Sequence, residues 1–477
     1  MTTRIIRRIL KGLRRLWNIF WPLLLIYTLL AILPSAPHQR VSEEFASSFQ
    51  AEDCYGDSAG KERILCIDDN EEALLWRLRV IETAQEEIVF STFEMRDDNS
   101  GQDVTAALYA AAERGVHVRI LVDGLTGYYQ LHDSSRFQAL VSHENVEAKF
   151  YNPVNLARPW KISYRLHDKY LMADDTVYIL GGRNTYDLFL GDYAEKANID
   201  RDILVYETDT AAEGTSLAQV QAYFEEIWEL SCCKEFVCEE ISEEMQTAVV
   251  SLEEHYAWLG ETYPEAYEET DYAAATMETN QVTLLANPME AENREPELWT
   301  MLQELMTGAD DVVIQTPYIV CSRAMYQNLT AICESAGSVE IITNAVESGA
   351  NPFGCTDYLN QKENILETGV SVCEFLGDDS THVKTFLIDD RLSVVGSYNL
   401  DMRSTYLDTE MMLAIDCEEL NEKLRAETDE CREQSKQLAP DGTVQYGTEY
   451  QAVELTTKKK VFYAAFRIFI WPIRYLL

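Results

Sequence analysis

The pattern of apolar and polar positions in this 477-residue chain predicts two similar halves. A helix-like stretch that begins at Leu75-Trp76 leads into the strand-like run 87–92, and a similar stretch at Leu298-Trp299 leads into 312–316. In each half a second helical period and two short apolar strands follow, the helices at 104–114 and 325–335 and the strands at 118–122, 146–150, 339–342 and 370–375. Apolar β-rich runs that alternate with helical periods are typical of α/β units with parallel strands.

This repeat also divides the chain into segments. We expect two α/β lobes related by a pseudo-two-fold axis, and we interpret the acidic, mostly helical residues between them as a connecting or capping insert. The predicted boundaries are 1–36 for a basic segment and anchor, 37–61 for a linker, 62–235 for the first lobe, 236–282 for the insert, 283–435 for the second lobe and 436–477 for a tail.

Residues 16–33 form an uncharged apolar run close to the roughly 20 residues that a helix needs to span a bilayer. Six basic residues precede it, namely Arg4, Arg7, Arg8, Lys11, Arg14 and Arg15. This charge bias predicts a cytoplasmic N-terminus with the body on the far side of the membrane. A cleaved signal peptide is the alternative, but the run is long for a signal core and Pro34-Ser35-Ala36 is a poor cleavage site. We therefore expect an uncleaved transmembrane anchor.

The charge distribution separates the ends of the chain from its body. Of the 39 basic residues, eleven lie in the first 15 or the last 20 positions, so residues 16–457 hold 28 basic against 81 acidic residues and carry a net charge of −53. A body with this charge repels polyanions, which argues against nucleic acid as a partner. The basic ends indicate an anionic membrane surface instead.

The last 20 residues have the pattern of an amphipathic helix. Lys460, Arg467 and Arg474 recur every seven residues on one face, and aromatic and aliphatic residues surround the rest. We expect this segment to lie in the membrane interface with a kink at Pro472. A tail helix packed on the body is the alternative.

Eleven cysteines are more than a reducing compartment requires. Cys54 and Cys66 bracket a short polar loop, and Cys232, Cys233 and Cys238 form a cluster. None of the spacings repeats the CxxC pattern of a zinc site. One or two disulfides would fit an extracytoplasmic body, and buried reduced thiols fit the sequence equally well.

One motif occurs once in each predicted lobe with identical spacing, H-x-K-x4-D-x6-G-[GS]-x-N. Its copies are His167, Lys169, Asp174, Gly181, Gly182 and Asn184 in the first lobe, and His382, Lys384, Asp389, Gly396, Ser397 and Asn399 in the second. The two copies use two of only seven histidines in the chain, which makes coincidence improbable.

The motif has a coherent physical interpretation. Alternate residues of a strand face the same side, so each histidine projects together with its lysine. A turn after the next strand returns a small residue and an asparagine to the same place, and the small residue (Gly182 or Ser397) permits close approach of a ligand. Packing two such lobes about a two-fold axis predicts one site with two imidazoles, two ammonium groups and two amides. The lysines would supply the positive charge for a phosphate, so we expect no metal and no cofactor.

The duplicated motif resembles the hallmark of the phospholipase D superfamily, and further segments are similar to bacterial cardiolipin synthases. These segments are Phe150-Tyr151-Asn152-Pro153, Thr316-Pro317-Tyr318, Thr343-Asn344 and Gly396 to Ser404 followed by Thr409-Glu410. The resemblance covers about residues 62–435 and implies two mixed sheets flanked by helices. It also implies a phosphatidyltransferase in a bacterial cell membrane that uses phosphatidylglycerol, with phosphatidylethanolamine as a second candidate substrate.

The resemblance implies a reaction through a phosphohistidine. We assign His167 as the nucleophile and His382 as the acid and base, although the pseudo-symmetry permits the reverse. Lys169, Lys384, Asn184 and Asn399 would hold the phosphate oxygens. Glu410 and Asp202 are candidates to orient the imidazoles, whereas we interpret Asp174 and Asp389 as structural.

Three functions follow from these features. A phosphatidyltransferase is the hypothesis that we favour, because membrane tethers at both ends place the site where lipid is plentiful and water is scarce. The alternative is a hydrolase of the same superfamily, a phospholipase D rather than a nuclease. A membrane scaffold without activity is the third, and the two complete motifs argue against it.

Overall fold

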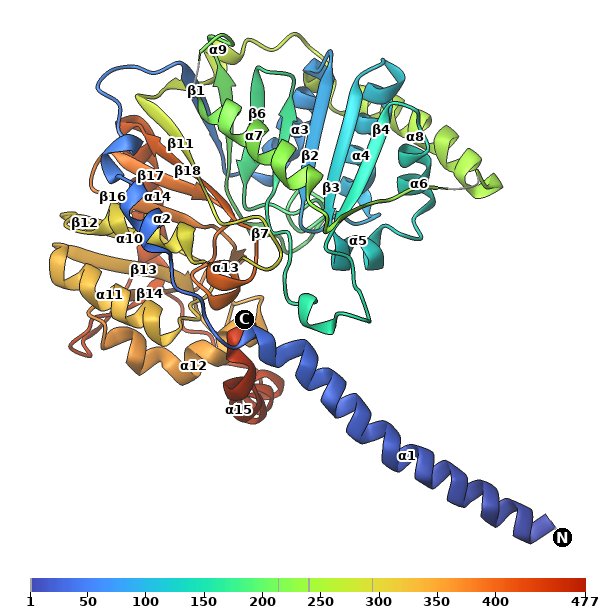
Figure 1. Cartoon of the computed structure of the whole chain (residues 1–477). Helices are drawn as coiled ribbons and strands as arrows, with labels where there is room; N and C mark the ends of the chain where they lie inside the picture. The colour runs from blue at the N-terminus through green and yellow to red at the C-terminus, as the bar shows by residue number, and fades with distance from the viewer. Residues whose placement is uncertain (1, 213, 239–240, 294) are drawn as a thin grey trace.

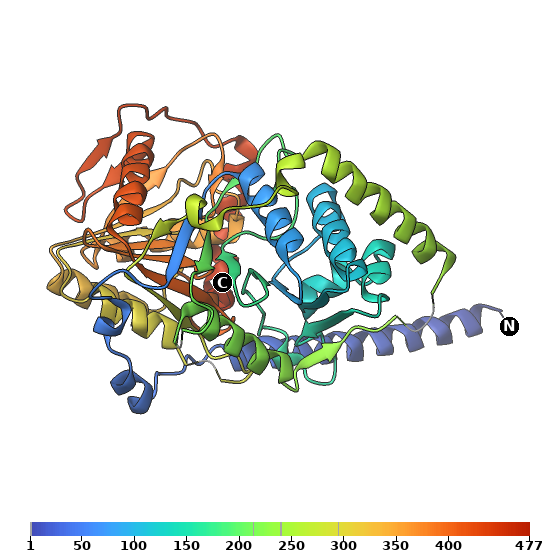
Figure 2. The same cartoon turned by 90° about the horizontal axis from the view of Figure 1, so that it is seen from above.

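The computed structural model describes residues 2–477 apart from 213, 239, 240 and 294. Two lobes lie side by side, each built on a nine-stranded mixed sheet (Figures 1 and 2). The expectation of two similar α/β lobes, each with a mixed sheet flanked by helices, is confirmed.

The first sheet has the strand order β10-β1-β8-β6-β5-β2-β3-β4-β9. Its strands are β1 Glu62–Ile67, β2 Glu87–Thr92, β3 His117–Asp123, β4 Val146–Tyr151, β5 Tyr170–Ala173, β6 Val177–Gly181, β8 Asp202–Glu207, β9 Cys233–Glu235 and β10 Met277–Glu278. Strands β2, β3 and β4 are parallel, as the repeat predicted, and the remaining pairs are antiparallel.

The second sheet has the order β11-β18-β17-β16-β12-β13-β14-β19-β20. Its strands are β11 Gln281–Ala286, β12 Asp311–Gln315, β13 Ser338–Asn344, β14 Ser371–Phe375, β16 Thr385–Ile388, β17 Leu392–Gly396, β18 Met411–Asp416, β19 Ser435–Leu438 and β20 Val444–Tyr446. From β11 onward this order matches the first sheet from β1 onward, strand for strand. A small parallel pair, β7 Asn198–Ile199 with β15 Ser380–Thr381, joins the two lobes.

Successive side chains of a strand point to opposite faces of its sheet, and the buried residues on these faces form three hydrophobic cores. In β6, Val177 and Ile179 belong to the outer core of the first lobe, whereas Tyr178 and Leu180 belong to a core that both lobes share. The helices of the first outer core include α3 Asn70–Thr83, α4 Asn99–Glu113, α6 Ser135–Val141 and α8 Glu243–Thr262, and those of the second include α10 Glu297–Met306, α11 Arg323–Ser335 and α12 Pro352–Leu366. Strands that bury both faces therefore hold the lobes together.

The shared core also takes side chains from α7 Ser216–Glu229 and α14 Glu418–Glu433. A buried arginine crosses the junction between the lobes. Arg201 Nη1 donates to Gln315 Oε1 and to Thr385 Oγ1, each at 3.1 Å, and its Nε donates to Asp68 Oδ1 at 2.6 Å. Because the guanidinium is buried, these bonds fix how the lobes are placed relative to one another.

Asp174 and Asp389 directly follow β5 and β16, at equivalent hairpin turns. Both adopt a left-handed backbone conformation, with φ of 50° and 52°, which aspartate tolerates better than most residues. Asp174 accepts the backbone N–H groups of residues 85–87, each at 2.9 Å, and Asp389 accepts those of 310 and 311. These bonds fasten the β5 hairpin to the start of β2 and the β16 hairpin to the start of β12. In each hairpin the aspartate lies at the opposite end of the first strand from the histidine.

Helix α1 Thr2–Ile32 projects from the body (Figure 1). Within the described part of the chain, the segment Leu10–Ser35 is the one helix long and apolar enough to cross a membrane, and its residues 10–30 are all exposed. The predicted linker is packed rather than loose. It forms α2 Glu43–Ser48 and a short turn whose Cys54 is fully buried in the core of the second lobe.

The tail forms α15 Thr457–Ile470, followed by the 3-10 helix Trp471–Leu476. Tyr463 and Ile470 are buried against the second lobe, so the tail helix packs on the body, which was the alternative interpretation of its sequence. Two of the basic side chains expected in the membrane interface bond to α12 instead. Arg467 Nε donates to Asn360 Oδ1 at 2.7 Å, and Arg474 Nη2 donates to Asp357 Oδ2 at 2.8 Å.

No disulfide joins any of the eleven cysteines within the described residues. Most of the thiols are buried among apolar side chains, and burial raises the pKa of Cys54 and of Cys66 to about 12. The structure thus agrees with the second of the two interpretations left open by the sequence, that of buried reduced thiols.

Candidate active site

The two copies of the motif lie on matching hairpins. His167 and Lys169 stand on an extended segment just before β5, and His382 and Lys384 stand just before β16, so neither pair is inside a strand. The backbone N–H at the end of the next strand bonds back to each lysine carbonyl, from Gly181 at 3.2 Å and from Gly396 at 3.4 Å. The hairpins thereby place the loops that carry Asn184 and Asn399 beside the histidine-lysine pairs.

The histidines are held by carboxylates from the opposite lobe. In the first pair, Nδ1 of His167 lies 2.9 and 3.0 Å from the two carboxyl oxygens of Glu410, which precedes β18. In the second pair, Nδ1 of His382 lies 2.6 Å from Oδ2 of Asp200, which precedes β8. Each Nδ1 is thus held by a carboxylate of the opposite lobe, and the site is complete only when both lobes are present.

Asp200, rather than Asp202, occupies the position equivalent to Glu410. Asp202 contacts two arginines of its own lobe, Arg77 at 2.9 Å and Arg183 at 3.3 Å. The strand register shows why Asp200 is the equivalent residue. Gly181 pairs with Asp202, and its counterpart Gly396 pairs with Met412, so Asp202 corresponds to Met412. Glu410 lies two residues before Met412, and Asp200 lies two residues before Asp202. The loop before the carboxylate is five residues longer in the first lobe, so sequence spacing alone did not reveal this equivalence.

The variable [GS] position of the motif faces the carboxylate in both lobes. A Cβ atom on Gly182 would overlap the Asp200 carboxylate, which explains why the first lobe carries glycine there. In the second lobe Ser397 donates from Oγ to Glu410, and Ser404 donates to the other carboxyl oxygen. The residue at this position therefore shapes the carboxylate's environment, in addition to leaving room for a ligand as the sequence suggested.

The lysines and asparagines of the motif are buried around the histidines. Lys384 Nζ lies 3.1 Å from Nε2 of His382, and Lys169 Nζ donates to the His167 carbonyl at 2.5 Å. The amide oxygens of Asn184 and Asn399 are buried without a hydrogen-bond partner among the described residues. Buried polar groups are normally paired, so these two amides mark a place prepared for a polar ligand.

Two phenylalanines that sequence reasoning missed cover the imidazoles. The Phe93 ring lies 5.0 Å from the His167 ring and the Phe189 ring lies 5.0 Å from the His382 ring, both edge to face. Phe93 follows β2, whereas Phe189 belongs to the long loop after β6. These positions are not equivalent in sequence, so the repeat offered no signal for them.

Burial dominates the acid-base properties of the first pair. It lowers the pKa of His167 well below its ordinary value, and the nearby Lys169 charge adds to this effect. Burial also raises the pKa of Glu410 to about 8, against the opposing charge of Lys169. His167 is therefore a neutral imidazole at neutral pH, with an available lone pair.

The second pair differs. Burial alone would raise the pKa of Asp200, but the charges of Lys384 and His382 prevail and lower it to about 2. Burial and the Lys384 charge lower the pKa of His382 to about 4. Asp200 is thus a fixed anion beside His382, whereas Glu410 is easily protonated, and the pseudo-symmetric site is electrostatically unequal.

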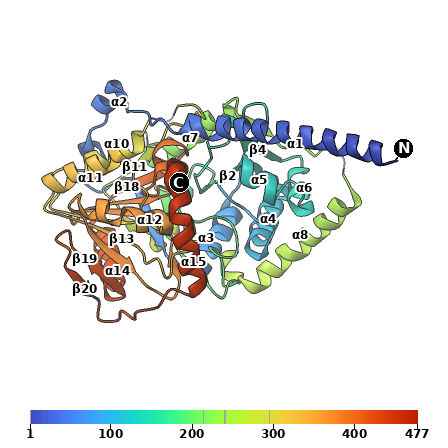
Figure 3. The ribbon, with the colours of Figure 1, turned by 90° about the horizontal axis from the view of Figure 1, so that it is seen from below.

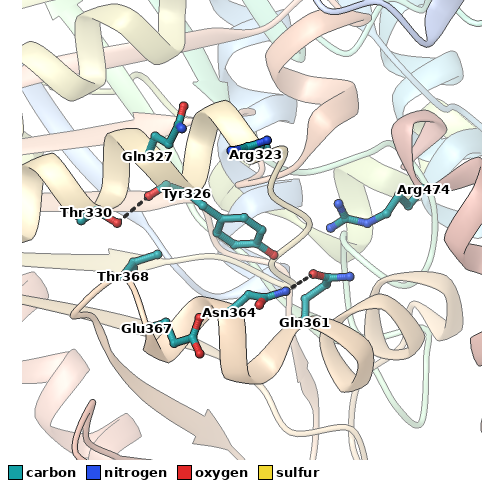
Figure 4. A pocket seen from close by; sticks show the side chains of 9 residues that line it. All are labelled: Arg323, Tyr326, Gln327, Thr330, Gln361, Asn364, Glu367, Thr368 and Arg474. Atoms are coloured by element: carbon teal, nitrogen blue, oxygen red, sulfur yellow. Dashed lines mark hydrogen bonds between the residues drawn. The ribbon is translucent and has the colours of Figure 1, made fainter.

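A separate polar cavity of about 440 Å³ lies between α11 and α12. Figure 4 shows its lining side chains, which include Arg323, Tyr326 and Arg474. Asn364 donates to Gln361 within it at 2.7 Å. The cavity shares no residue with the histidine site, and the tail contributes Arg474 to its lining.

Comparisons with known proteins agree with this geometry. The family model described as "Cardiolipin synthase, PLD-like domain" matches residues 78–228 and 301–432. Cardiolipin synthase C of Escherichia coli K12 is 25% identical over 402 residues, covering 73% of this chain and 80% of that protein. An uncharacterised protein of Helicobacter pylori strain 26695 is 24% identical over 413 residues, covering 78% of this chain and 80% of that protein.

A solved structure has the same fold. The crystal structure of phosphatidylserine synthase from Haemophilus influenzae superposes with a TM-score of 0.61 at 18% identity, covering 89% of this chain and 97% of that one. The two hairpins, the paired sheets and the family match define a two-lobed phospholipase D-like enzyme fold. The chain belongs to the cardiolipin synthase, PLD-like domain family.

Proposed function

We propose that the protein transfers a phosphatidyl group from one phospholipid to another through a covalent intermediate on His167. The observation that carries this proposal is the reciprocal arrangement of the two histidines, each with Nδ1 held by a buried carboxylate of the other lobe. One site with two such imidazoles can supply a nucleophile and an acid-base group at the same phosphorus. Membership of the family supports phospholipid chemistry.

In the first half-reaction Nε2 of His167 attacks the phosphodiester phosphorus. As the N–P bond forms, the bond from phosphorus to the glycerol oxygen of the leaving head group breaks, and that oxygen takes a proton from Nε2 of His382. The imidazole of His167 becomes cationic as the N–P bond forms, and its Nδ1–H donates to the Glu410 carboxyl group, which stabilises that charge.

In the second half-reaction His382 acts as the base. It removes the proton from the hydroxyl group of the incoming lipid, whose oxygen attacks the phosphorus and displaces Nε2 of His167. If water takes the place of that hydroxyl group, the same steps release phosphatidic acid. The acceptor alone therefore distinguishes the transferase from a phospholipase D.

Two lysines and two asparagines would bind the non-bridging phosphate oxygens. Burial lowers the pKa of Lys169 to about 7 and that of Lys384 to about 8. An anionic phosphodiester between them would favour their charged forms, and it would also weaken the repulsion that lowers the pKa of His382. Substrate binding thus prepares His382 to carry the proton that it must donate, with Asp200 as its anionic partner.

Localisation and substrates follow from the same proposal. The apolar segment Leu10–Ser35 would anchor the protein in a bacterial cell membrane, with the body on the extracytoplasmic side as the basic N-terminus predicts. The donor would be phosphatidylglycerol, and the acceptor a second phosphatidylglycerol or phosphatidylethanolamine. The net charge of −53 carried by residues 16–457 disfavours the nuclease branch of the superfamily.

Lipid product analysis tests the proposal directly. The purified chain in mixed micelles with labelled phosphatidylglycerol, with and without phosphatidylethanolamine, is expected to form cardiolipin that mass spectrometry detects. His167→Ala is expected to abolish the product. His117→Ala should retain it, because His117 is half-exposed and is the first residue of β3, outside the histidine site. Phosphatidic acid as the sole product would show a phospholipase, and no product from folded protein would overturn both hypotheses.

Gly182→Ala is expected to lower turnover by about 10–100-fold while the protein stays folded. The added methyl group overlaps the Asp200 carboxylate and moves it away from Nδ1 of His382. The matched control is Gly260→Ala on α8, where a methyl group meets nothing within 4 Å. Initial rates and circular dichroism on both variants check this, and equal rates for the two would show that the Asp200 position is unimportant.

A further inference from the structure

Several segments that carry exposed apolar side chains meet on the face of the protein where the parallel strands end. Strand β3 runs into α5 Gly124–Gln130, β4 runs into the loop 152–165, and the loop after β13 leads into α12. Figure 1 shows α1, α5 and α15 on the lower side of the molecule, and Figure 3 views that side. We call six exposed residues of these segments the apolar rim, namely Tyr129, Leu156, Trp160, Phe353, Phe469 and Trp471.

Contacts connect α1, the loop 152–165 and the tail. Tyr27 of α1 donates from its hydroxyl to the Leu156 carbonyl at 2.9 Å. At the other end of the same loop, Arg403 Nη2 donates to the Ser163 carbonyl at 3.0 Å, and the Arg403 backbone N–H donates to the Leu477 carbonyl at 2.9 Å. The membrane-spanning candidate, the loop and the tail are therefore held at fixed positions around one place.

Two of the connected segments adjoin the histidine site along the chain. The loop 152–165 ends two residues before His167. Arg403 lies in α13 Met402–Tyr406, between Asn399 and Glu410 in the chain. Packing of the tail also leaves Ile468, Phe469 and Trp471 pointing outward, although a soluble helix end would expose polar residues there.

We propose that the apolar rim docks on the surface of an anionic bilayer and holds the histidine site against the lipid from which its substrates come. This inference rests on the proposed function. The rim continues the surface of α1, the part of the chain suited to cross a membrane. Exposed Lys458, Lys460 and Arg467 stand beside the rim on α15, in contrast to the acidic body, so charge favours an anionic membrane over a second copy of this acidic chain.

Tryptophan quenching tests the docking. The full chain, carrying Trp17→Phe and Trp21→Phe to silence α1, is placed in nanodiscs of phosphatidylglycerol with brominated acyl chains. Bromine quenches only tryptophans that reach the acyl region, so we expect Trp160→Phe with Trp471→Phe to remove most of the quenchable signal. Trp258→Phe is the control, because Trp258 is 42% exposed on α8 and lies outside the rim. Equal quenching before and after the rim substitutions would overturn the proposal. Loss of the quenchable fluorescence only in Trp258→Phe would also overturn it.

A second measurement separates docking from chemistry. Phe469→Asp with Trp471→Asp is expected to reduce turnover of long-chain phosphatidylglycerol in the bilayer by about tenfold and to change turnover of a monomeric short-chain analogue by less than about twofold. Equal losses on both substrates would contradict membrane docking. Quenching without any lipid product would support the docking and refute the proposed reaction. Lipid product without quenching would support the reaction and refute the docking.

Discussion

A His382→Asn variant is expected to stop after the first half-reaction and accumulate a phosphatidyl group on His167. With a donor whose leaving group is p-nitrophenolate, the P–O bond breaks without an acid, so the N–P bond at His167 still forms. Removal of the phosphatidyl group requires the missing base, and steady-state turnover should fall by about 10²–10⁴-fold. A burst of about one nitrophenolate per chain and a mass adduct on the peptide that contains His167 check this.

The variant at the other histidine tests which of the two imidazoles is the nucleophile. His167→Asn is expected to show neither burst nor adduct, because the nucleophile is gone. An adduct on His382 in that variant would reverse the two roles. The electrostatics of the site favour His167 as the nucleophile, since the anionic Asp200 beside His382 stabilises an imidazolium ion better than the readily protonated Glu410 beside His167 does.

Glu410→Gln is expected to lower turnover by about 10²–10⁴-fold and at the same time to stabilise the fold relative to the wild type as the pH rises. Burial raises the pKa of Glu410 to about 8 in the folded protein, against about 4.3 in an unfolded chain. The stability that a neutral Glu410 contributes is complete below the unfolded pKa and is lost as the pH rises through the folded pKa. The wild type should therefore lose up to about 1.4 kcal/mol per pH unit relative to the variant between about pH 4.3 and 8.

Chemical denaturation of both proteins at pH 5 and pH 8, with initial rates at each pH, measures this trade-off. Ser397→Ala is the matched control, because it removes one donor to Glu410 and leaves the carboxyl group in place. A difference in unfolding free energy that does not change with pH would show that Glu410 has an ordinary pKa. It would also remove the electrostatic inequality on which the assignment of the two histidines depends.

The sequence predicted the repeat and the residues of the motif because both depend on local chemistry and on spacing within a lobe. Strand β12 and helix α11, for example, begin and end within two residues of their predicted limits. Glu410 was found through the family resemblance. The sequence did not predict that its partner His167 lies in the other lobe, although packing about a two-fold axis already implied a shared site.

The remaining features depend on contacts that no local pattern encodes. Asp200 was missed because loop length, rather than residue type, decides which of two nearby carboxylates reaches His382. Arg467 and Arg474 were expected in the membrane interface because the spacing of the tail does not reveal that both side chains bond to α12. The cover provided by Phe93 and Phe189 arises from two loops that are unrelated in sequence.

The exchange of carboxylates between the lobes has an evolutionary consequence. Each lobe carries a carboxylate together with the small residue that accommodates it, Asp200 with Gly182 and Glu410 with Ser397. After a gene duplication, a mutation in one copy would thus alter the reactivity of the histidine encoded by the other copy. The basicity of the two imidazoles can diverge in this way while both histidine motifs stay unchanged, which offers a route from two equivalent halves to a dedicated nucleophile and a dedicated acid.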